Sequence, residues 1–474
     1  MLKKKVKNIC CIGAGYVGGP TMAVIADNCN YLNITVVDIN EERISKWNSS
    51  DFDNLPVYEP GLKEIIKRVR NRNLFFTIDL KNSIKNADMI FISVNTPTKT
   101  SGFGAGYASD LKWVEASARQ VAQNAVGHTI VIEKSTLPVR TAKVIKQILI
   151  SSFDEEFENK TEKSFSILSN PEFLAEGTAI EDLNNPDRVL IGGDEEDSIN
   201  ALKNIYEKWV PEDKIITTNL WSSELSKLAA NAFLAQRISS INSISAICEA
   251  TGAEVNEVSN AIGFDSRIGF KFLSAGPGFG GSCFKKDILN LVYLCRYFGL
   301  NEVAEYWEQV VKFNEWHTKR ISKLIVEKLF DTVALKKILI LGFSYKANTN
   351  DTRESPAIKI VKDLLENGAE IIISDPQVDP DIIALDLGIE ENVFKNGSGQ
   401  GKWRYHKDIY EAAMGVDAVV IITEWKVYKS LSWHKLVKVM RKPAWLFDTR
   451  SITNYEELKD LDINYWSIGN SNYC

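Results

Sequence analysis

The sequence predicts an α/β protein in which two doubly wound domains are joined by a central domain built on a long helix. Three observations carry this prediction. Short β-branched runs alternate with helical patterns in the first part of the chain, the same alternation returns near its end, and one uninterrupted helical pattern lies between them. We expect the three domains to cover residues 1–219, 220–330 and 331–474.

The first domain begins with a strand, a glycine turn, a helix and a second strand. VKNICCI is a short apolar run, TMAVIADNC has a helical pattern, and NITVVD reads as a strand that ends at Asp38. DMIFISV, TIVIEKS and SFSILSN have the same buried-strand character. Such strands, separated by helices, are typical of a parallel sheet covered on both faces.

The central domain begins near Trp221. The following segment has no proline or glycine until Gly252, which predicts one long helix capped by Ser222. Helical patterns continue to about Phe330 without a comparable strand signal. One of them, FKKDILNLVYLCRYFG, starts directly after Cys283.

The last domain repeats the logic of the first. KKILILGFSY predicts a strand and turn, SPAIKIVKDLLENG a helix closed by Gly368, and AEIIISDP a strand, while DAVVIITEW echoes DMIFISVNT. The segment at 395–404, KNGSGQGKWR, has the composition of a mobile loop. Doubly wound folds of this kind bind ligands in clefts at the ends of their strands.

Composition excludes several functions. The net charge of -6 comes without a long basic run, so neither nucleic acid nor an anionic membrane is an expected partner. No segment approaches the roughly 20 apolar residues of a membrane span, and no secretory signal follows MLKKK. The seven cysteines form no disulfide framework, which predicts a reduced, cytoplasmic protein. No Cys/His spacing predicts a metal site.

A glycine motif follows the first predicted strand. Gly13, Gly15 and Gly18 have the G-x-G-x-x-G spacing, in which the glycines allow a tight turn, close approach to a pyrophosphate and close helix packing. Asp38 ends the next strand, where an acid accepts hydrogen bonds from ribose hydroxyls. This pattern predicts a Rossmann-like site for NAD, although the nearby Arg43 tempers the preference over NADP. A tight turn in an unrelated α/β domain is the alternative.

Two further motifs follow predicted strands and therefore face the expected cofactor cleft. These are SVNTPT at 93–98 and EKSTLPVR at 133–140, for which ordinary loop chemistry is the alternative. In NPEFLAEGTA, Glu172 and Glu176 are four residues apart and would share a face if the segment were helical. They would then hold a base or orient a sugar, and exposed glutamates are the alternative.

Lys227 and Asn231 lie four apart on the predicted long helix, so they share a face that can bind a hydroxyl or an oxyanion. A lysine that snorkels to solvent is the alternative. Cys283 lies at the start of a predicted helix, close to Lys285 and Lys286, and both features favour a thiolate. Asp287, one turn later, is placed to hold a lysine or a water near the sulfur. Two roles of Cys283 therefore remain open at this point: a catalytic nucleophile and a packing residue.

Taken together, the motifs resemble a known family. GAGYVGGP, SVNTPTKT, EKSTLPVR, SNPEFLAEGTA, NPDRVLIGG, GFGGSCFKKD, DTRES and the long-helix segment occur in the order seen in UDP-glucose 6-dehydrogenases of the eukaryotic type. These enzymes belong to the UDP-glucose/GDP-mannose dehydrogenase family, and the resemblance covers nearly the whole chain. It implies the NAD-dependent four-electron oxidation of UDP-glucose to UDP-glucuronate through a cysteine thiohemiacetal and thioester, with two NADH formed per sugar.

The resemblance also assigns residues. The implied catalytic residues are Cys283, Lys227, Asp287, Glu172, Thr136 and Asn231. The implied NAD contacts are Gly13, Gly15, Tyr16, Val17, Gly18, Asp38, Arg43, Val94, Asn95, Thr96, Pro97, Thr98, Ser135, Thr136, Glu176 and Arg353. The implied UDP-glucose contacts are Glu172, Phe173, Leu174, Ala175, Glu176, Lys227, Asn231, Arg267, Phe272, Ser274, Phe279, Gly280, Tyr345, Lys346 and Arg450, with Arg267 reaching into a neighbouring subunit's site.

Other functions compete with this interpretation. A relative acting on another nucleotide sugar, such as GDP-mannose or UDP-N-acetylmannosamine, would share most of these motifs. A two-electron hydroxyacid dehydrogenase of similar fold would not need Cys283. A catalytically silent nucleotide-binding protein is disfavoured because Lys227, Asn231, Cys283 and Asp287 occur together. The composition and the long central helix, a candidate dimer core, predict self-association as a dimer or larger assembly, and a hexamer is possible.

Overall fold

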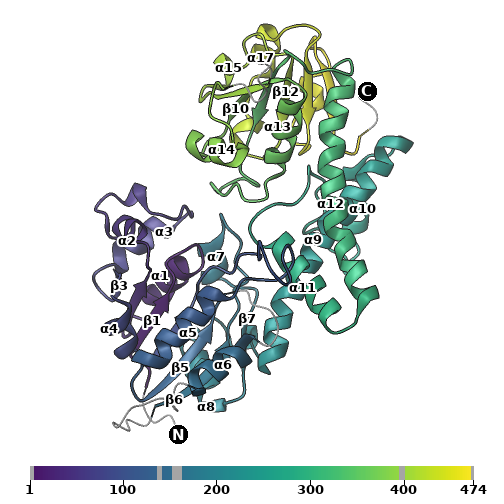
Figure 1. Cartoon of the computed structure of the whole chain (residues 1–474). Helices are drawn as coiled ribbons and strands as arrows, with labels where there is room; N and C mark the ends of the chain where they lie inside the picture. Colours follow the sequence, from purple (N-terminus) through teal and green to yellow (C-terminus); the bar gives the residue numbers. More distant parts are fainter. Residues whose placement is uncertain (1–4, 136–140, 152–162, 394–400, 471–474) are drawn as a thin grey trace. The chain divides into compact units, whose positions relative to one another are not determined.

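The computed structural model describes residues 5–135, 141–151, 163–393 and 401–470. The chain divides into two compact units. The N-terminal unit comprises Met1–Ala230 and Leu289–Ala304, and the C-terminal unit comprises Asn231–Ile288 and Glu305–Cys474. Each unit contains one sheet covered by helices (Figure 1), which confirms the predicted fold class.

The N-terminal sheet has the strand order β3-β2-β1-β4-β5-β6-β7-β8 among the described residues. All neighbouring strands pair in parallel except β6 and β7, which are antiparallel, so the expected all-parallel sheet is wrong at this one pair. The strands are β1 (Asn8–Ile12), β2 (Asn33–Val37), β3 (Leu74–Thr77), β4 (Met89–Ile92), β5 (His128–Glu133), β6 (Ser164–Ser169), β7 (Val189–Gly193) and β8 (Ile215–Thr218).

Helices lie on both faces of this sheet. Successive side chains of its central strand point to opposite sides, so apolar residues project from both faces and the helices cover them. Cys11 belongs to a hydrophobic cluster with Met22 and Leu202, whereas the adjacent Cys10 packs with Val114 and Ile145 on the other face. The helices are α1 (Gly18–Asn28), α2 (Glu41–Asn48), α3 (Leu62–Val69), α4 (Leu80–Lys85), α5 (Lys112–Asn124), α6 (Thr141–Ser151), α7 (Ala179–Asn184) and α8 (Glu196–Tyr206).

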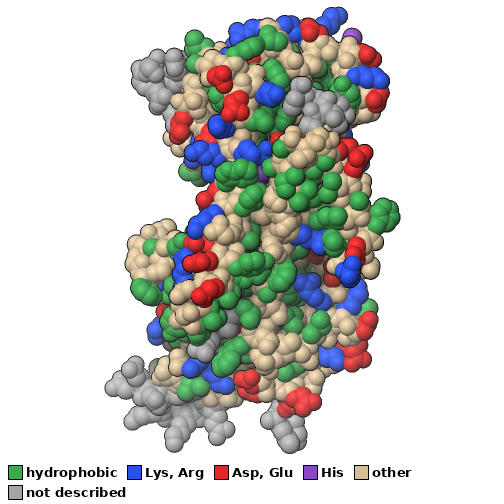
Figure 2. Space-filling view, turned by 90° about the vertical axis from the view of Figure 1, so that its right-hand side faces the viewer, with side chains coloured by type: hydrophobic (Ala, Val, Ile, Leu, Met, Phe, Trp, Pro, Cys, Tyr) green, Lys and Arg blue, Asp and Glu red, His purple; other side chains and the backbone are tan. Residues whose placement is uncertain are grey.

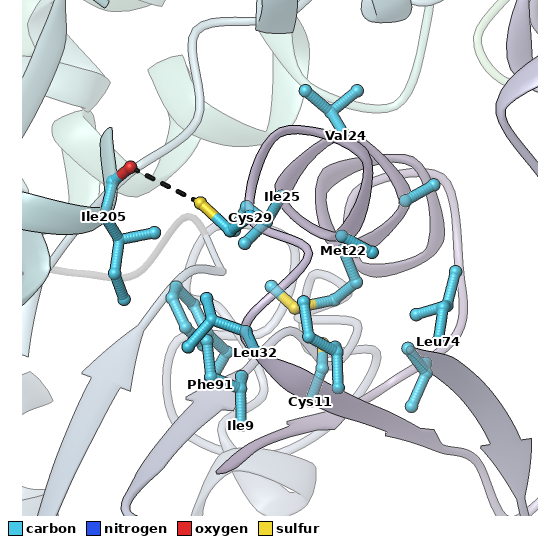
Figure 3. Close-up of a cluster of buried hydrophobic side chains, with 14 of the residues drawn as sticks. Ile9, Cys11, Met22, Val24, Ile25, Cys29, Leu32, Leu74, Phe91 and Ile205 are labelled. Atoms are coloured by element: carbon cyan, nitrogen blue, oxygen red, sulfur yellow. Dashed lines mark hydrogen bonds between the residues drawn. The ribbon is translucent and has the colours of Figure 1, made fainter. Parts of the chain in front are cut away.

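Three of the cysteines are packing residues of this unit. Figure 3 shows Cys11 and Cys29 among Ile9, Met22 and Leu32, with the Cys29 thiol directed at the carbonyl of Ile205, 3.7 Å away. Burial raises the pKa of Cys10 to about 12 and raises that of Cys11 further. These thiols are therefore protonated at neutral pH and unsuited to nucleophilic chemistry.

The predicted long helix is α9 (Leu220–Thr251). Its cap is not Ser222, which lies inside the helix. Instead, the side-chain oxygen of Asn219 accepts the Ser222 N–H at 2.8 Å. The other helices of this region are α10 (Val255–Gly263), α11 (Phe284–Tyr297) and α12 (Asn301–Lys328), and residues 220–330 contain no strand, as predicted. The boundary between the two units falls within α9, α11 and α12.

The C-terminal sheet has the order β11-β10-β9-β12-β13-β14 among the described residues, and every pair is parallel. The loop predicted for 395–404 is wrong from Lys402 onward, where the chain forms β11 around the buried Trp403; residues 394–400 lie outside the described residues. The strands are β9 (Lys337–Leu341), β10 (Glu370–Ser374), β11 (Lys402–Tyr405), β12 (Ala418–Ile421), β13 (Trp445–Asp448) and β14 (Asn464–Ser467).

Two hydrophobic clusters cover the two faces of this second sheet, so it is doubly wound like the first. Ile338 and Ile340 pack on one face, whereas Leu339 and Leu341 pack on the other. The helices are α13 (Pro356–Glu366), α14 (Pro380–Leu387), α15 (Ile409–Ala412), α16 (Lys426–Lys429) and α17 (Trp433–Val439).

The surface carries charges of both signs. On the face shown in Figure 2, lysine and arginine side chains are interspersed with aspartate and glutamate. Among the described residues, no helix is both long enough and apolar enough to cross a membrane.

Candidate active site

The glycine motif forms the tight turn between β1 and α1. Gly13 has φ +110°, and a Cβ there would lie 2.2 Å from the carbonyl oxygen of Ser93. A Cβ at Gly18 would lie 2.0 Å from the carbonyl oxygen of Gly13, so this glycine lets α1 approach the turn closely. At Gly15, by contrast, a Cβ would meet no atom within 4 Å. The turn therefore has open space on the side where a pyrophosphate would lie.

Asp38 lies at the end of β2 beside this turn, and its side chain is only 8% exposed. One carboxylate oxygen accepts the Ala14 N–H at 2.9 Å and an Arg43 N–H at 3.0 Å, and the other accepts the Asn40 N–H at 2.9 Å. The Arg43 guanidinium is thus paired with the Asp38 carboxylate. A carboxylate side chain at this position can accept hydrogen bonds from ribose hydroxyls.

Trp47 of α2 packs against the glycine turn. Its indole N–H donates to the carbonyl of Ala14 at 3.0 Å, and its ring stacks on Phe76 with centroids 4.7 Å apart. Tyr16 is half-buried and packs against the same cluster, while Val17 is the residue that immediately precedes α1. The glycine turn is therefore a packed, fixed structure.

The loops that follow β4 and β5 meet as the parallel sheet predicts. The Ser135 hydroxyl donates to the carbonyl of Val94 at 2.7 Å, which joins the two loops. Thr96 is buried, and Thr98 forms an isolated bridge with Ser109. These loops include the expected cofactor contacts Asn95 and Pro97. Thr136, expected to be catalytic, lies outside the described residues.

The segment that carries Glu172 and Glu176 is not helical, because α7 begins only at Ala179. The condition under which the two glutamates would share a helix face is therefore not met. Glu172 is buried, and its carboxylate lies 3.6 Å from the ammonium of Lys227, whose side chain is also buried. Lys227 is thus not a snorkelling residue. Glu176 is half-buried.

Phe173 forms the apolar part of this segment. The guanidinium of Arg188 lies 3.7 Å from the centre of its ring and the Lys227 ammonium 5.4 Å away. Leu174 is half-buried and Ala175 exposed; the Ala175 N–H donates to Asp182 at 2.8 Å. The segment is therefore held by side-chain contacts instead of helical hydrogen bonds.

Lys134 is a candidate site residue that the sequence reasoning missed. It is 3% exposed, and its ammonium donates to the side-chain oxygen of Asn170 at 3.1 Å, which also accepts the Tyr206 hydroxyl at 2.7 Å. Burial lowers the pKa of Lys134 to about 8, with the charge of Glu172 acting in the opposite direction. The signal was present in TIVIEKS, which places a lysine at the end of an otherwise apolar buried strand.

In the C-terminal unit, Cys283 directly precedes α11, as predicted, and is partly exposed. Its carbonyl accepts the N–H of Asp287 at 2.8 Å, and its thiol lies 3.4 Å from the hydroxyl of Ser282. Asp287 is 1% exposed and accepts the side-chain N–H of Asn231 at 2.6 Å. The structure thus brings together three of the predicted catalytic residues.

Lys285 was expected to favour the thiolate, but its charge is engaged elsewhere. Its ammonium lies 3.1 Å from Glu354 and 3.3 Å from Glu315. Two carboxylates around one ammonium cancel its positive field. The position of Cys283 at the N-terminus of α11 therefore carries more of the argument for a reactive thiol.

Several predicted sugar-nucleotide residues lie in the loop before Cys283 or beside it. Phe279 and Gly280 are buried, whereas Ser274 is exposed. The Arg450 guanidinium donates to the carbonyls of Ile422 at 2.7 Å and Tyr345 at 3.1 Å. Its Nη1 lies 2.9 Å from the position of a Cβ on Gly276, so Arg450 borders the loop.

The remaining predicted residues are more exposed. Arg353 forms a bidentate pair with Asp351 at 2.8 and 2.7 Å, and the Lys346 ammonium lies 5.5 Å from the centre of the Tyr345 ring. Phe272 is 42% exposed with φ +63°. The Arg267 side chain is 87% exposed and pairs with Asp265. No group of metal-ligating side chains occurs in the described part of the chain.

Comparison with known proteins identifies the class. Three domains of the UDP-glucose/GDP-mannose dehydrogenase family match the chain: the NAD binding domain at residues 7–210, the central domain at 221–316 and the UDP binding domain at 339–455. The chain belongs to this family. It is therefore an oxidoreductase, and NAD is its cofactor, as predicted.

Individual relatives agree over nearly the full length. UDP-glucose 6-dehydrogenase of Bos taurus is 55% identical over 98% of this chain and 93% of its own. UDP-glucose 6-dehydrogenase 4 of Arabidopsis thaliana is 53% identical over 97% and 96%. Among solved structures, a UDP-glucose dehydrogenase from Pyrobaculum islandicum superposes with a TM-score of 0.82 at 27% identity, covering 99% of each chain.

Proposed function

We propose that this enzyme oxidises UDP-glucose to UDP-glucuronate in two successive steps, through covalent intermediates on Cys283. One observation carries the proposal: a partly exposed thiol at the N-terminus of α11 stands one turn before a buried aspartate that is hydrogen-bonded to Asn231. An enzyme that removed a single hydride would have no use for such a thiol. The relatives that are 53–55% identical are named for UDP-glucose, which supports this sugar nucleotide as the substrate.

The residues around the glycine turn fit NAD. Gly15 leaves the space that a pyrophosphate needs, Asp38 would accept the ribose hydroxyls, and the loops joined by Ser135 would border the nicotinamide. When bound, NAD accepts a hydride from the sugar in each oxidation. Tyr16, Val17, Arg43, Val94, Asn95, Thr96, Pro97, Thr98, Thr136, Glu176 and Arg353 complete the proposed set of cofactor contacts.

The first oxidation removes a hydride from the carbon of the sugar's primary alcohol and the proton from its hydroxyl, which leaves an aldehyde. The chain's own residues then react with this aldehyde. The Cys283 sulfur adds to the aldehyde carbon, and the oxygen takes up a proton to give a thiohemiacetal. Loss of the remaining carbon-bound hydrogen as hydride, and of the hydroxyl proton, leaves a thioester. Water then adds to the thioester carbon, and the carboxylate departs as the Cys283 sulfur regains a proton. The sugar's primary alcohol and one water thus become a carboxylate, with the release of two hydrides and three protons.

Charged and polar groups stabilise the negative charge that develops on the oxygen of the reacting carbon during these steps. We assign Lys227 and Asn231 to the developing oxyanion, because both are buried and both carry N–H donors. Asp287 and Thr136 are assigned to the attacking water, and Glu172 to proton transfer beside Lys227. The buried Lys227–Glu172 ion pair supports this assignment, since it places the Glu172 carboxylate 3.6 Å from the Lys227 ammonium.

The UDP-glucose contacts follow the same proposal. The segment at 172–176 and Lys227 would contact the sugar, and Phe272, Ser274, Phe279, Gly280, Tyr345, Lys346 and Arg450 would hold the nucleotide. Arg267 would act in the site of a neighbouring copy of this chain, and its 87% exposed side chain is consistent with that role. The proposal includes self-association, a cytoplasmic location and the three domains at 1–219, 220–330 and 331–474.

The deciding experiment counts NADH per sugar with UDP-glucose limiting and NAD in excess. Two NADH per UDP-glucose are expected, and one would show that the reaction stops at the aldehyde and contradict the role of Cys283. If no NADH forms, GDP-mannose and UDP-N-acetylmannosamine are the next substrates to test.

The thiol itself is tested by Cys283→Ser, with Cys295→Ser as the matched control on the same helix. Cys295 is buried in α11, so its replacement leaves the site chemistry intact. Cys283→Ser should lose steady-state turnover by a factor of about 10³ or more while still binding NAD. NADH production by this variant at the wild-type rate would disprove the thioester mechanism.

A further inference from the structure

A loop of four glycines, one proline and one phenylalanine leads into Cys283, yet it is fixed at almost every residue. We call Gly276–Gly281 the glycine loop. All six of its residues are buried. Its first residue, Gly276, is held from α9, where the side-chain oxygen of Asn242 accepts the Gly276 N–H at 2.9 Å. Asn242 itself is fully buried.

Three side chains of α12 hold the same loop, and we call Asn314, His317 and Thr318 the α12 clamp. The His317 ring is hydrogen-bonded through Nε2 to the carbonyl of Gly276 at 2.9 Å, and the Thr318 hydroxyl donates to the carbonyl of Pro277 at 2.9 Å. Asn314 accepts the Phe279 N–H at 2.9 Å and donates to the Phe279 carbonyl at 3.0 Å.

The contact between the loop and the clamp leaves no spare space. Gly278 has φ +129°, and a Cβ there would lie 2.8 Å from the Thr318 hydroxyl and 3.0 Å from the Asn314 side-chain oxygen. A side chain at this position would therefore displace the clamp. The loop needs glycine here because its backbone lies directly against α12.

The protonation of His317 follows from its partner. A carbonyl can only accept a hydrogen bond, so the ring must carry its proton on Nε2 and donate it to Gly276. His317 is fully buried, and burial lowers its pKa to about 4, so the ring is neutral at pH 7. The bond is therefore a fixed donor–acceptor contact under physiological conditions.

The other end of the loop is held by the segment at Arg353 and Glu354. The Gly281 N–H donates to the carbonyl of Arg353 at 2.8 Å, and a Cβ on Gly280 would lie 2.6 Å from the carbonyl of Glu354. Lys285, two residues after Cys283, joins Glu354 to Glu315, which is the neighbour of Asn314 on α12. The thiol thus stands between a fixed loop and a fixed helix start.

We propose that the α12 clamp positions Cys283 and the glycine loop for catalysis, although none of its three side chains is assigned to substrate, cofactor or the reacting atoms. The inference builds on the proposed function, because the loop borders the proposed sugar-nucleotide site. Loss of a clamp hydrogen bond frees the loop backbone, so the proposed sugar-nucleotide contacts of Phe279 and Gly280 and the position of the Cys283 thiol are no longer fixed. Asn314, His317 and Thr318 are positioning residues in this scheme.

The test compares His317→Leu, which removes the donor, with His317→Gln, which keeps an N–H donor at similar reach. Two properties are measured: KM for UDP-glucose, and the rate at which iodoacetamide alkylates Cys283 in the ligand-free enzyme, followed by peptide mass spectrometry. His317→Leu should raise KM about tenfold and alkylation about threefold, with KM for NAD unchanged, and His317→Gln should restore both. Lys323→Ala, at an exposed position of the same helix, is the control.

Thr318→Val preserves volume and removes only the hydroxyl, so it tests the clamp if His317→Leu does not fold. Wild-type KM and alkylation rate in both Thr318→Val and a folded His317→Leu would overturn the proposal. Equal impairment by His317→Leu and His317→Gln would also overturn it, because packing instead of the donated bond would then be responsible. If wild type does not oxidise UDP-glucose, the proposed function fails, and the alkylation rates still decide the positioning role.

Discussion

At the scale of single residues, two aspartates at equivalent positions of the two sheets have different surroundings. Asp38 follows β2 and accepts hydrogen bonds from the backbone of Ala14 and Asn40 and from the Arg43 side chain. Asp375 follows β10 and accepts the N–H groups of Phe343, Ser344, Gln377 and Val378, the Ser344 hydroxyl and the indole of Trp425. The second carboxylate is therefore committed to the fold.

We expect this difference to separate binding from stability. Asp38→Asn should raise KM for NAD about tenfold, because the amide is a weaker acceptor for ribose hydroxyls than a carboxylate. Asp375→Asn should leave that KM unchanged and lower the free energy of unfolding by about 2–4 kcal/mol, since an amide N–H would face the donors that the carboxylate now satisfies. Steady-state kinetics and urea unfolding measure both quantities, and equal effects on KM would contradict the distinction.

A buried acid pair sets a pH dependence of stability. Burial and the neighbouring Glu224 raise the pKa of Glu133 well above its usual range. The folded chain then keeps a proton on Glu133 that the unfolded chain releases. The contribution of Glu133 to the free energy of unfolding is therefore fully present below about pH 4.3 and is lost as the pH rises towards the raised pKa. Glu133→Gln should remove this fall between pH 5 and 8, as measured by the urea midpoint.

The exposed Glu196 on α8 provides the control for this prediction. Glu196→Gln should leave the pH dependence of the urea midpoint as it is in wild type. If Glu133→Gln keeps the wild-type slope as well, Glu133 is not the group that retains the proton in the folded chain.

At the scale of elements, the close packing of α1 against Trp47 of α2 fixes the cofactor turn. A Cβ on Gly19 would lie 2.3 Å from the Trp47 ring, which stacks on Phe76 and donates to Ala14. Gly19→Ala should therefore displace Trp47 and destabilise the protein by about 1–3 kcal/mol, the usual cost of overpacking a core. A lowered urea midpoint together with a raised KM for NAD is expected, and an unchanged midpoint would show that the ring moves freely.

Sequence patterns predicted the elements better than their ends and edges. Periodicity and glycine spacing located β1, α1, β2, the long α9 and the start of α11, because these depend on local composition. The sequence pattern predicts Ser222 as the cap of α9, but Asn219 provides it. Both side chains can accept an N–H, and only tertiary packing selects the register.

Other errors have tertiary causes. The pairing direction of β6 with β7 depends on the path of the connection and not on either strand's composition. The four-residue spacing of Glu172 and Glu176 is compatible with a helix, yet the segment takes its shape from partners distant in sequence, among them Arg188 and Lys227. The buried Lys134 was overlooked because a lysine ordinarily indicates the surface.

At the scale of the whole molecule, the two compact units have separate sheets and hydrophobic clusters, with one glycine turn suited to a dinucleotide in the N-terminal unit. We expect NAD alone to slow amide hydrogen exchange in β1, α1 and the loop at 93–98 without changing exchange in β9 to β14. UDP should protect the loops bordered by Tyr345 and Arg450 and leave the NAD turn unaffected. Protection of both sheets by NAD alone would contradict this assignment.

The open space at Gly15 has a consequence for how this chain can vary. Gly13 and Gly18 are required by the protein's own backbone, so an alanine at either position is eliminated whether or not a ligand is present. At Gly15 the folded chain alone accepts a methyl group, and only a bound pyrophosphate would reject it. Selection for foldability therefore maintains two glycines of the motif, and selection for cofactor use maintains the third. In a lineage that lost its chemistry but kept its fold, Gly15 would be the first of the three to drift.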